Sequence, residues 1–112
     1  MKMISAVIKP YKIDDVKNAL KEIGVTGLTK SNVEGFGKQG GHKEIYRSQE
    51  YNVAFVCKTK IEIVVSDEMV DKVIKVIIKN ARTGEIGDGK IFVSPVERAI
   101  RIRTGEEGND AL

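Results

Sequence analysis

The sequence V-A-F-V-C-K-T-K-I-E-I-V-V, residues 53–65, has the alternating pattern that is typical of a long β-strand. Odd positions from 55 to 65 carry Phe, Cys, Thr, Ile, Ile and Val, whereas even positions from 56 to 64 mix Val with Lys and Glu. After Ser66 the spacing becomes helical, because apolar residues recur at 70, 73, 74, 77, 78 and 81. We therefore expect a half-buried strand that leads into an amphipathic helix, with Ser66 as the helix N-cap.

Residues 1–36 predict a strand, a helix and a second strand in that order. Residues 3–8 alternate with little charge on either face, and Pro10 ends this strand. Apolar residues then recur at helical spacing from 13 to 23, and Gly24 follows the last turn as a helix stop. The second strand is expected from about 28 to 36.

The C-terminal third contains T-G-E-I-G-D-G-K, residues 83–90, between the second helix and a short strand at 91–94. Pro95 ends this strand, an extended run to Arg103 follows, and we expect the polar residues 104–112 to be flexible without a ligand. The full order, β-α-β-β-α-β, predicts an α+β protein with the ferredoxin-like split βαβ fold, a four-stranded antiparallel sheet with two helices on one face. The half-apolar free face of this sheet indicates that another subunit covers it.

Composition places the chain among small one-domain proteins. Its 112 residues form one expected domain, 1–112, which is large enough for a hydrophobic core. The single cysteine cannot form an internal disulfide and no apolar run reaches membrane-spanning length, so we expect a cytoplasmic protein without membrane insertion. The net charge of +3 comes from 19 basic and 16 acidic residues that are largely interspersed, which argues against nucleic acid as a partner.

The glycine-rich loop, defined here as residues 82–90, has the composition of a phosphate-binding loop. Closely spaced glycines let successive N–H groups turn towards an anion, and Lys90 adds a positive charge. The loop is not a P-loop motif, because a helix precedes it, a strand follows it, and Ile91 stands where Ser or Thr would bind magnesium. The alternative is a turn in which Gly84 caps the preceding helix, and the stretch taken alone does not separate the two interpretations.

A long polar loop, from about residue 37 to 49, joins the second and third strands where a tight hairpin would suffice. Loops of this length are usually functional or disordered. Its glycine-flanked His42 has neither an orienting partner nor a fixed position, which argues against a catalytic histidine. Tyr51, at the edge of the loop, is either available to a partner or a modifying enzyme, or simply starts the third strand.

Arg101 and Arg103 are two residues apart in the extended run, so they would project from one face and hold an anion between them. The alternative is that the acidic residues Glu97, Glu106 or Glu107 balance them.

The third strand contains two further candidate residues. Lys58 on a half-buried strand would need a carboxylate ligand to be functional, and would otherwise extend to solvent. Cys57 is expected to be a small buried apolar residue rather than a nucleophile. No cluster of His, Cys or acidic residues has metal-ligand spacing.

Three separated motifs, in the right order, resemble those of PII signal-transduction proteins, the trimeric nitrogen and energy sensors of bacteria and archaea. T-G-E-I-G-D-G-K-I-F-V-S, residues 83–94, fits the C-terminal signature of that family. V-E-G-F-G-K-Q-G-G-H, residues 33–42, is similar to the start of its long T-loop, here about 37–52, and R-I-R-T-G-E-E, residues 101–107, resembles its terminal run. The resemblance implies a homotrimeric binding protein rather than an enzyme.

The resemblance implies ATP or ADP in clefts between subunits, with 2-oxoglutarate bound beside it through Mg²⁺. The residues that match the ATP/ADP contacts of the family are Gly27, Leu28, Thr29, Gly37, Lys38, Glu62, Val64, Gly87, Gly89, Lys90, Arg101 and Arg103. Those that match the 2-oxoglutarate contacts are Gln39, Lys58 and Gly87. Gln39 would also be the metal ligand, and Lys58 would pair with the distal carboxylate.

The resemblance further implies control of nitrogen assimilation through the T-loop. The expected partners are an ammonium transporter, whose pore the residue matching Arg47 enters, or glutamine synthetase or its regulators. Tyr51 matches a modified tyrosine of the family, but the surrounding run departs from the uridylylation pattern at Ser48 and Gln49. Lys38 stands where many members have arginine, which keeps the charge and loses the bidentate fork.

An RNA-recognition module is the alternative from another class, because it has the same order of elements. Such modules stack bases on aromatic side chains of the sheet, yet the third strand reads V-A-F-V-C-K-T-K and the chain is 5% aromatic. A small ferredoxin-like enzyme is a third possibility, and no positioned nucleophile or base supports it.

Overall fold

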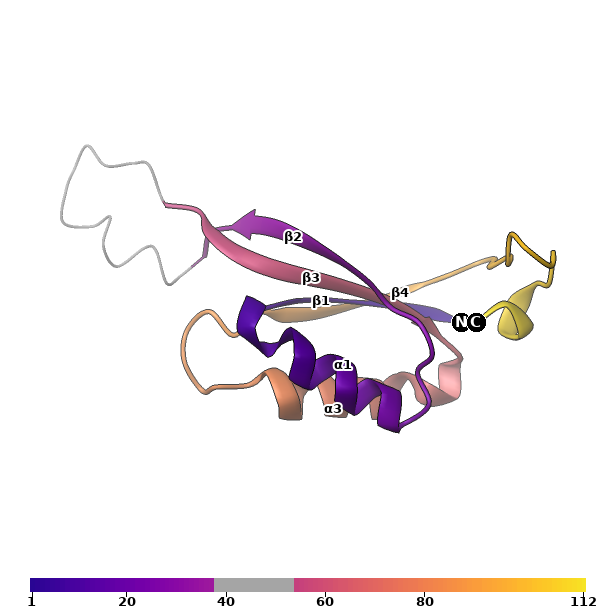
Figure 1. Cartoon of the computed structure of the whole chain (residues 1–112), viewed down its shortest axis with the longest axis horizontal. Coiled ribbons are helices and arrows are strands. Elements are labelled where there is room, and N and C mark those ends of the chain that lie inside the picture. The colour runs from indigo at the N-terminus through magenta and orange to yellow at the C-terminus, as the bar shows by residue number, and fades with distance from the viewer. Residues whose placement is uncertain (38–53) are drawn as a thin grey trace.

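The computed structural model describes residues 1–37 and 54–112, and its elements follow the predicted β-α-β-β-α-β order (Figure 1). The regular elements are β1 (Lys2–Ile8), α1 (Ile13–Glu22), β2 (Thr29–Gly35), β3 (Val56–Val65), α3 (Val70–Ala81) and β4 (Lys90–Pro95). Short 3-10 helices lie at Pro10–Lys12, Asp67–Met69 and Gly108–Ala111. The predicted fold class is confirmed.

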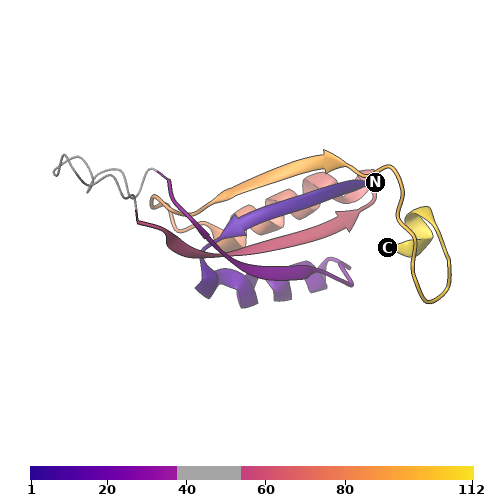
Figure 2. The same ribbon diagram turned by 90° about the horizontal axis from the view of Figure 1, so that it is seen from above.

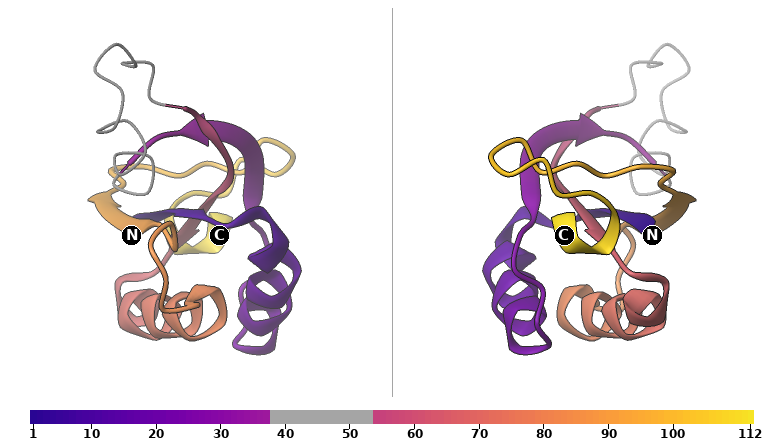
Figure 3. Two further views of the ribbon diagram at one scale, coloured as in Figure 1. Left: turned by 90° about the vertical axis from the view of Figure 1, so that its left-hand side faces the viewer. Right: turned by 90° about the vertical axis from the view of Figure 1, so that its right-hand side faces the viewer.

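The four strands form one antiparallel sheet in the order β2-β3-β1-β4, so β1 and β3 are central (Figure 2). Seen end-on, α1 and α3 lie side by side on the same face of this sheet (Figure 3). We call the opposite sheet face the open face. Within one chain no helix of the described residues covers it.

The core lies between the two helices and the sheet. Alternate residues of β1 and β3 point into it, as the two-residue period predicted, and meet one stripe of each helix. Its buried members are Ile4, Ala6, Ile8, Val16, Leu20, Ile61, Ile63, Val65, Val73, Ile77 and Ala81.

Helix α1 ends as its sequence predicts. Gly24 has a φ of +96°, and the N–H groups of Gly24 and Val25 donate to the carbonyls of Lys21 and Leu20 at 3.1 and 3.0 Å. This is a Schellman motif, which satisfies the last free carbonyls of the helix.

The start of the second helix differs from the prediction. Ser66 precedes the 3-10 turn Asp67–Met69 rather than α3, and its side chain makes no capping hydrogen bond. Its backbone carbonyl accepts from the N–H of Met69 at 3.0 Å, and α3 begins only at Val70. The expected N-cap role of Ser66 is therefore wrong, because the 3-10 turn supplies the backbone partner instead.

Strand boundaries also shift. β3 begins at Val56, after Ala54 and Phe55, and β4 includes Pro95, which was expected to end it at Ser94. Pro95 is tolerated because β4 is an edge strand and Pro95 is its last residue. In the described parts of the chain, no helix combines the length and apolar character needed to cross a bilayer.

Candidate functional site

The glycine-rich loop leaves α3 after Ala81 and enters β4 at Lys90. Gly84, Gly87 and Gly89 have φ values of +88°, +100° and +102°, which L-residues with a Cβ rarely adopt. At Gly89 an added Cβ would fall on the carbonyl oxygen of Val7 in β1, so only glycine fits there. The helix C-cap is Arg82, in an extended conformation, and not Gly84 as the alternative interpretation proposed.

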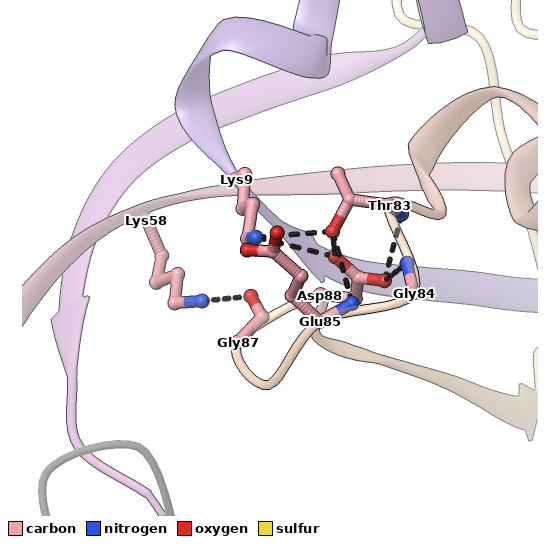
Figure 4. Close-up of polar contacts among 7 residues, drawn as sticks. All are labelled: Lys9, Lys58, Thr83, Gly84, Glu85, Gly87 and Asp88. Carbon is pink, nitrogen blue, oxygen red and sulfur yellow. Dashed lines mark hydrogen bonds and ion pairs between the residues drawn. The ribbon is translucent and has the colours of Figure 1, made fainter.

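The carboxylate of Asp88 holds the two ends of this loop together (Figure 4). It accepts hydrogen bonds from the backbone N–H groups of Thr83 and Gly84, both at 2.8 Å, and from the Thr83 hydroxyl. The Lys9 ammonium lies 3.4 Å from the carboxylate and donates to the Thr83 hydroxyl oxygen at 3.1 Å. The side-chain hydrogen bond from Thr83 is the main reason that the pKa of Asp88 lies well below its usual range, so Asp88 is ionised at neutral pH.

Lys58 is a buried cation on the other side of the same loop. Its ammonium reaches from β3 and donates a hydrogen bond to the carbonyl oxygen of Gly87, and the residue is only 8% exposed (Figure 4). Burial, followed by repulsion from Lys9, lowers the pKa of Lys58, while Asp88 acts in the opposite direction. Among the described residues no carboxylate forms an ion pair with Lys58, so its charge is neutralised only at a distance.

A cavity of about 540 Å³ lies beside Lys58 and the glycine-rich loop. It opens on the open face, because Val7, Lys58 and Phe92 alternate with core-facing neighbours along their strands. Its lining brings together five residues named from the sequence, Gly37, Lys58, Gly87, Gly89 and Lys90, with Val7, Gly35, Phe36, Ile86 and Phe92 around them. Two lysines and glycine backbone in one cavity fit an anionic ligand.

The residues matching adenine contacts lie elsewhere on the chain. Gly27 and Val64 line a second cavity of about 710 Å³, together with Ala99, Asn109 and Leu112. Thr29 and Glu62 are directly opposite each other in the β2–β3 ladder, and Leu28 packs partly against the core.

The two cavities belong to opposite ends of the sheet. Val7 of β1 pairs with Lys90, where the glycine-rich loop enters β4, and Lys2 pairs with Pro95, where β4 ends. Five residue steps of β1 separate these pairings, about 17 Å at the usual rise of a strand. Figure 1 shows the glycine-rich loop and the C-terminal segment at these two ends.

Arg101 and Arg103 do not project side by side from an extended segment, so that prediction was wrong. The chain turns at residues 102–104, because Gly105, with a φ of +75°, lets its N–H donate to the carbonyl of Arg101 at 2.8 Å. Arg101 forms an ion pair with Glu106 at 2.9 Å, as the alternative interpretation expected. The segment ends in the 3-10 helix Gly108–Ala111, and the flexibility expected of residues 104–112 stays a prediction.

Cys57 is exposed, which corrects the expectation that it is a small buried residue. β1 pairs with β3 only as far as Thr59, so Cys57 lies in a part of β3 that pairs with β2 alone. Cys57 does share the core-facing side of β3, as the alternation predicted. It remains exposed because the sheet has only two strands at that point. Residues 1–37 and 54–112 contain no group of three or more His, Cys, Asp or Glu side chains placed to hold a metal.

The candidate site residues Lys38, Gln39, Arg47 and Tyr51 lie outside the described residues, as do His42, Ser48 and Gln49. Sequence reasoning in turn missed Lys9 and the side-chain roles of Thr83 and Asp88. The position of Asp88 between two glycines was the one available signal, whereas Lys9 joins the loop only through the tertiary fold.

The alternative of an RNA-recognition module finds no support in the central strands. The open-face residues of β1 and of the buried part of β3 are Met3, Ser5, Val7, Lys58, Lys60, Glu62 and Val64, and none is aromatic. A base-stacking platform of the kind such modules use is therefore missing from this part of the sheet.

Comparison with known proteins places the chain in one family. The family model described as "Nitrogen regulatory protein P-II" matches residues 1–106. Nitrogen regulatory protein P-II of Haemophilus influenzae is 60% identical over 112 residues, all of both chains. The Pasteurella multocida protein of the same name and nitrogen regulatory protein P-II 1 of Escherichia coli K12 are each 59% identical, again over the full length of both chains. The chain therefore belongs to the nitrogen regulatory protein P-II family, whose members are signalling proteins rather than enzymes.

Proposed function

We propose that this protein senses ATP or ADP together with 2-oxoglutarate and regulates nitrogen assimilation in the cytoplasm through T-loop contacts with target proteins. The observation that carries the proposal is Lys58, a buried ammonium without a carboxylate partner among the described residues, at a glycine-lined cavity. A lysine ammonium has three donors, and its one described acceptor is the carbonyl of Gly87. A carboxylate ligand would supply the missing charge and relieve the unfavourable burial.

The same cavity suits the phosphates of a nucleotide. Gly87 and Gly89 expose backbone to it, Lys90 adds a second cation, and both glycines have conformations that other residues rarely adopt. When bound, Mg²⁺ would screen the repulsion between a triphosphate and a dicarboxylate. We assign Gln39, which lies outside the described residues, as the protein ligand of the metal. Lys38 would supply a positive charge near the phosphates.

The site requires a second copy of the chain. Arg101 and Arg103 follow the far end of β4, which lies about 17 Å along β1 from the glycine-rich loop, so the arginines and the loop cannot meet at one phosphate within a chain. We therefore propose a homotrimer in which the arginines of one subunit approach the loop of the next. Gly27, Leu28, Thr29, Glu62 and Val64 would then form the adenine region.

Signalling would follow from the position of Gly37. This residue lines the cavity and directly precedes the T-loop segment that contains Gln39, Arg47 and Tyr51. Ligation of the metal by Gln39 would favour one arrangement of the T-loop base and so offer or withdraw the surface around Arg47. We propose an ammonium transporter, or glutamine synthetase or its regulators, as targets, and Tyr51 as a possible modification site.

Calorimetric titration of 2-oxoglutarate into the protein tests the proposal. The titration is run with ATP and Mg²⁺, without ATP, without Mg²⁺, and with Lys58→Ala under the complete conditions. Lys60→Ala is the matched control, because Lys60 lies on the same strand and face but outside the cavity lining. We expect heat only when ATP, Mg²⁺ and Lys58 are all present. Binding that survives Lys58→Ala would contradict the assignment of the carboxylate site.

A further inference from the structure

The hydrogen-bond network around Asp88 is unusual for a loop that would receive phosphate, because it places a carboxylate next to an anion site. Both oxygens of this carboxylate are engaged, one by the N–H groups of Thr83 and Gly84 and the other by the Thr83 hydroxyl and Lys9. A carboxylate in this position with no other role would weaken phosphate binding by repulsion. Its electrostatic effect on phosphate therefore does not explain the network around Asp88.

The contacts of Thr83 indicate that the network fixes a conformation. Its hydroxyl donates to Asp88, and accepts from Lys9 at 3.1 Å and from the N–H of Glu85 at 3.2 Å. The hydroxyl thus uses its one donor and both acceptor positions, which allows few alternative arrangements of residues 83–88. Because Lys9 directly follows β1, the network also ties the loop to the sheet.

We propose that Asp88 is a positioning residue for the phosphate site, whose carboxylate closes the loop from Thr83 to Asp88 and thereby directs Gly87 and Gly89 towards the cavity. The geometry around Gly87 supports this. An added Cβ at Gly87 would lie 3.5 Å from the Lys58 ammonium and 3.6 Å from Cε of Lys9, so both lysine side chains approach this backbone closely. Lys9 is held by Asp88 on one side, and Lys58 binds the Gly87 carbonyl on the other.

The proposal makes a prediction of opposite sign to simple electrostatics. Asp88→Asn removes a negative charge near the proposed phosphate site, so repulsion alone would make ATP bind more tightly. The amide of Asn cannot accept on both sides, so the loop loses its closure, and we expect ATP affinity to fall by about tenfold. Glu85→Gln is the matched control, because it removes the same charge from the same loop and the Glu85 carboxylate has no hydrogen bond among the described residues.

The inference rests on the proposed nucleotide site, and the experiment separates the two. ATP binding is measured by calorimetry for the wild-type protein, Asp88→Asn, Glu85→Gln, Thr83→Val and Thr83→Ser, with thermal unfolding and hydrogen exchange of the Thr83 and Gly84 amides. We expect weaker binding and faster exchange in Asp88→Asn and Thr83→Val and recovery in Thr83→Ser. Because the ionised Asp88 carboxylate stabilises the folded state, Asp88→Asn should also melt at a lower temperature than Glu85→Gln.

Each result has a defined meaning. Wild-type protein that binds no ATP would overturn the proposed function together with this inference. Wild-type binding with equal or tighter binding by Asp88→Asn would overturn the positioning role alone. If Asp88→Asn does not fold, Thr83→Val decides, because it removes the hydroxyl and keeps the charge. ATP affinity unchanged in Thr83→Val would then refute the proposal.

Discussion

Replacing Gly89 with alanine tests how tightly the glycine-rich loop is fixed against the sheet. Two separate penalties act at this residue. Its φ of +102° is unfavourable for alanine by about 1–2 kcal/mol. The new Cβ would also overlap the carbonyl oxygen of Val7, a backbone atom of the central strand β1 that cannot swing aside as a side chain can.

Two other glycines separate these penalties. Gly84 has a φ of +88° but open space around it, so Gly84→Ala should lower the free energy of unfolding by only about 1 kcal/mol. Gly35 has open space and no positive φ, so Gly35→Ala should change it by no more than about 0.5 kcal/mol. Gly89→Ala carries both penalties, and we expect a loss of at least about 3 kcal/mol.

Urea unfolding of the three variants at one protein concentration measures these differences, because association would otherwise change the apparent stability. The expected order of destabilisation is Gly89→Ala, then Gly84→Ala, then Gly35→Ala. A Gly89→Ala protein no less stable than Gly84→Ala would show that the loop moves away from β1 at little cost. That result would also remove the geometric basis for requiring glycine at this position.

Three further outcomes are expected. Lys58→Met should leave the free energy of unfolding at neutral pH unchanged or raise it by about 1 kcal/mol, because a buried charge is removed, while calorimetry should show 2-oxoglutarate binding lost. Asp67 accepts a hydrogen bond from the N-terminal ammonium, which lowers the pKa of Asp67. Its contribution is present above the unfolded-state pKa and disappears as the pH falls through the folded-state pKa, so melting curves of wild type and Asp67→Asn should converge towards pH 3. Ile77→Ala in the core should lose about 2–5 kcal/mol in urea unfolding, whereas Ile78→Ala on the exposed side of α3 should lose less than about 1.5 kcal/mol.

The layout of the fold was predictable because apolar residues recur every second position in the strands and at helical spacing in the helices. The alternation in residues 53–65 identifies the faces of β3, and the stop at Gly24 identifies the end of α1. These signals are local, and the sheet order then follows from the β-α-β-β-α-β arrangement. Of the five residues around the first cavity, Lys58, Lys90 and the loop glycines were singled out from the sequence pattern, whereas Gly37 was named on the family resemblance alone.

The errors arise where a neighbour in space decides the outcome. Cys57 has the right side-chain direction, and is exposed because the sheet is only two strands wide at that point. Arg103 is an exception, because it was placed on an extended run although the turn that replaces this run is closed locally by Gly105. The partnership of Lys9 with Asp88 joins residues 79 positions apart in the chain, so no local pattern could contain it.

The separation of the glycine-rich loop from Arg101 along β1 has a consequence for mixed assemblies. If a site forms where the loop end of one chain meets the arginine end of the next, each interface joins unlike surfaces. A chain with Lys90→Ala then still contributes an intact arginine end, and a chain with Arg101→Ala still contributes an intact loop. Co-assembly of these two defective chains should therefore create some interfaces with the complete wild-type set. ATP binding in the mixture, at a level that neither parent shows alone, would identify intersubunit complementation and a head-to-tail ring.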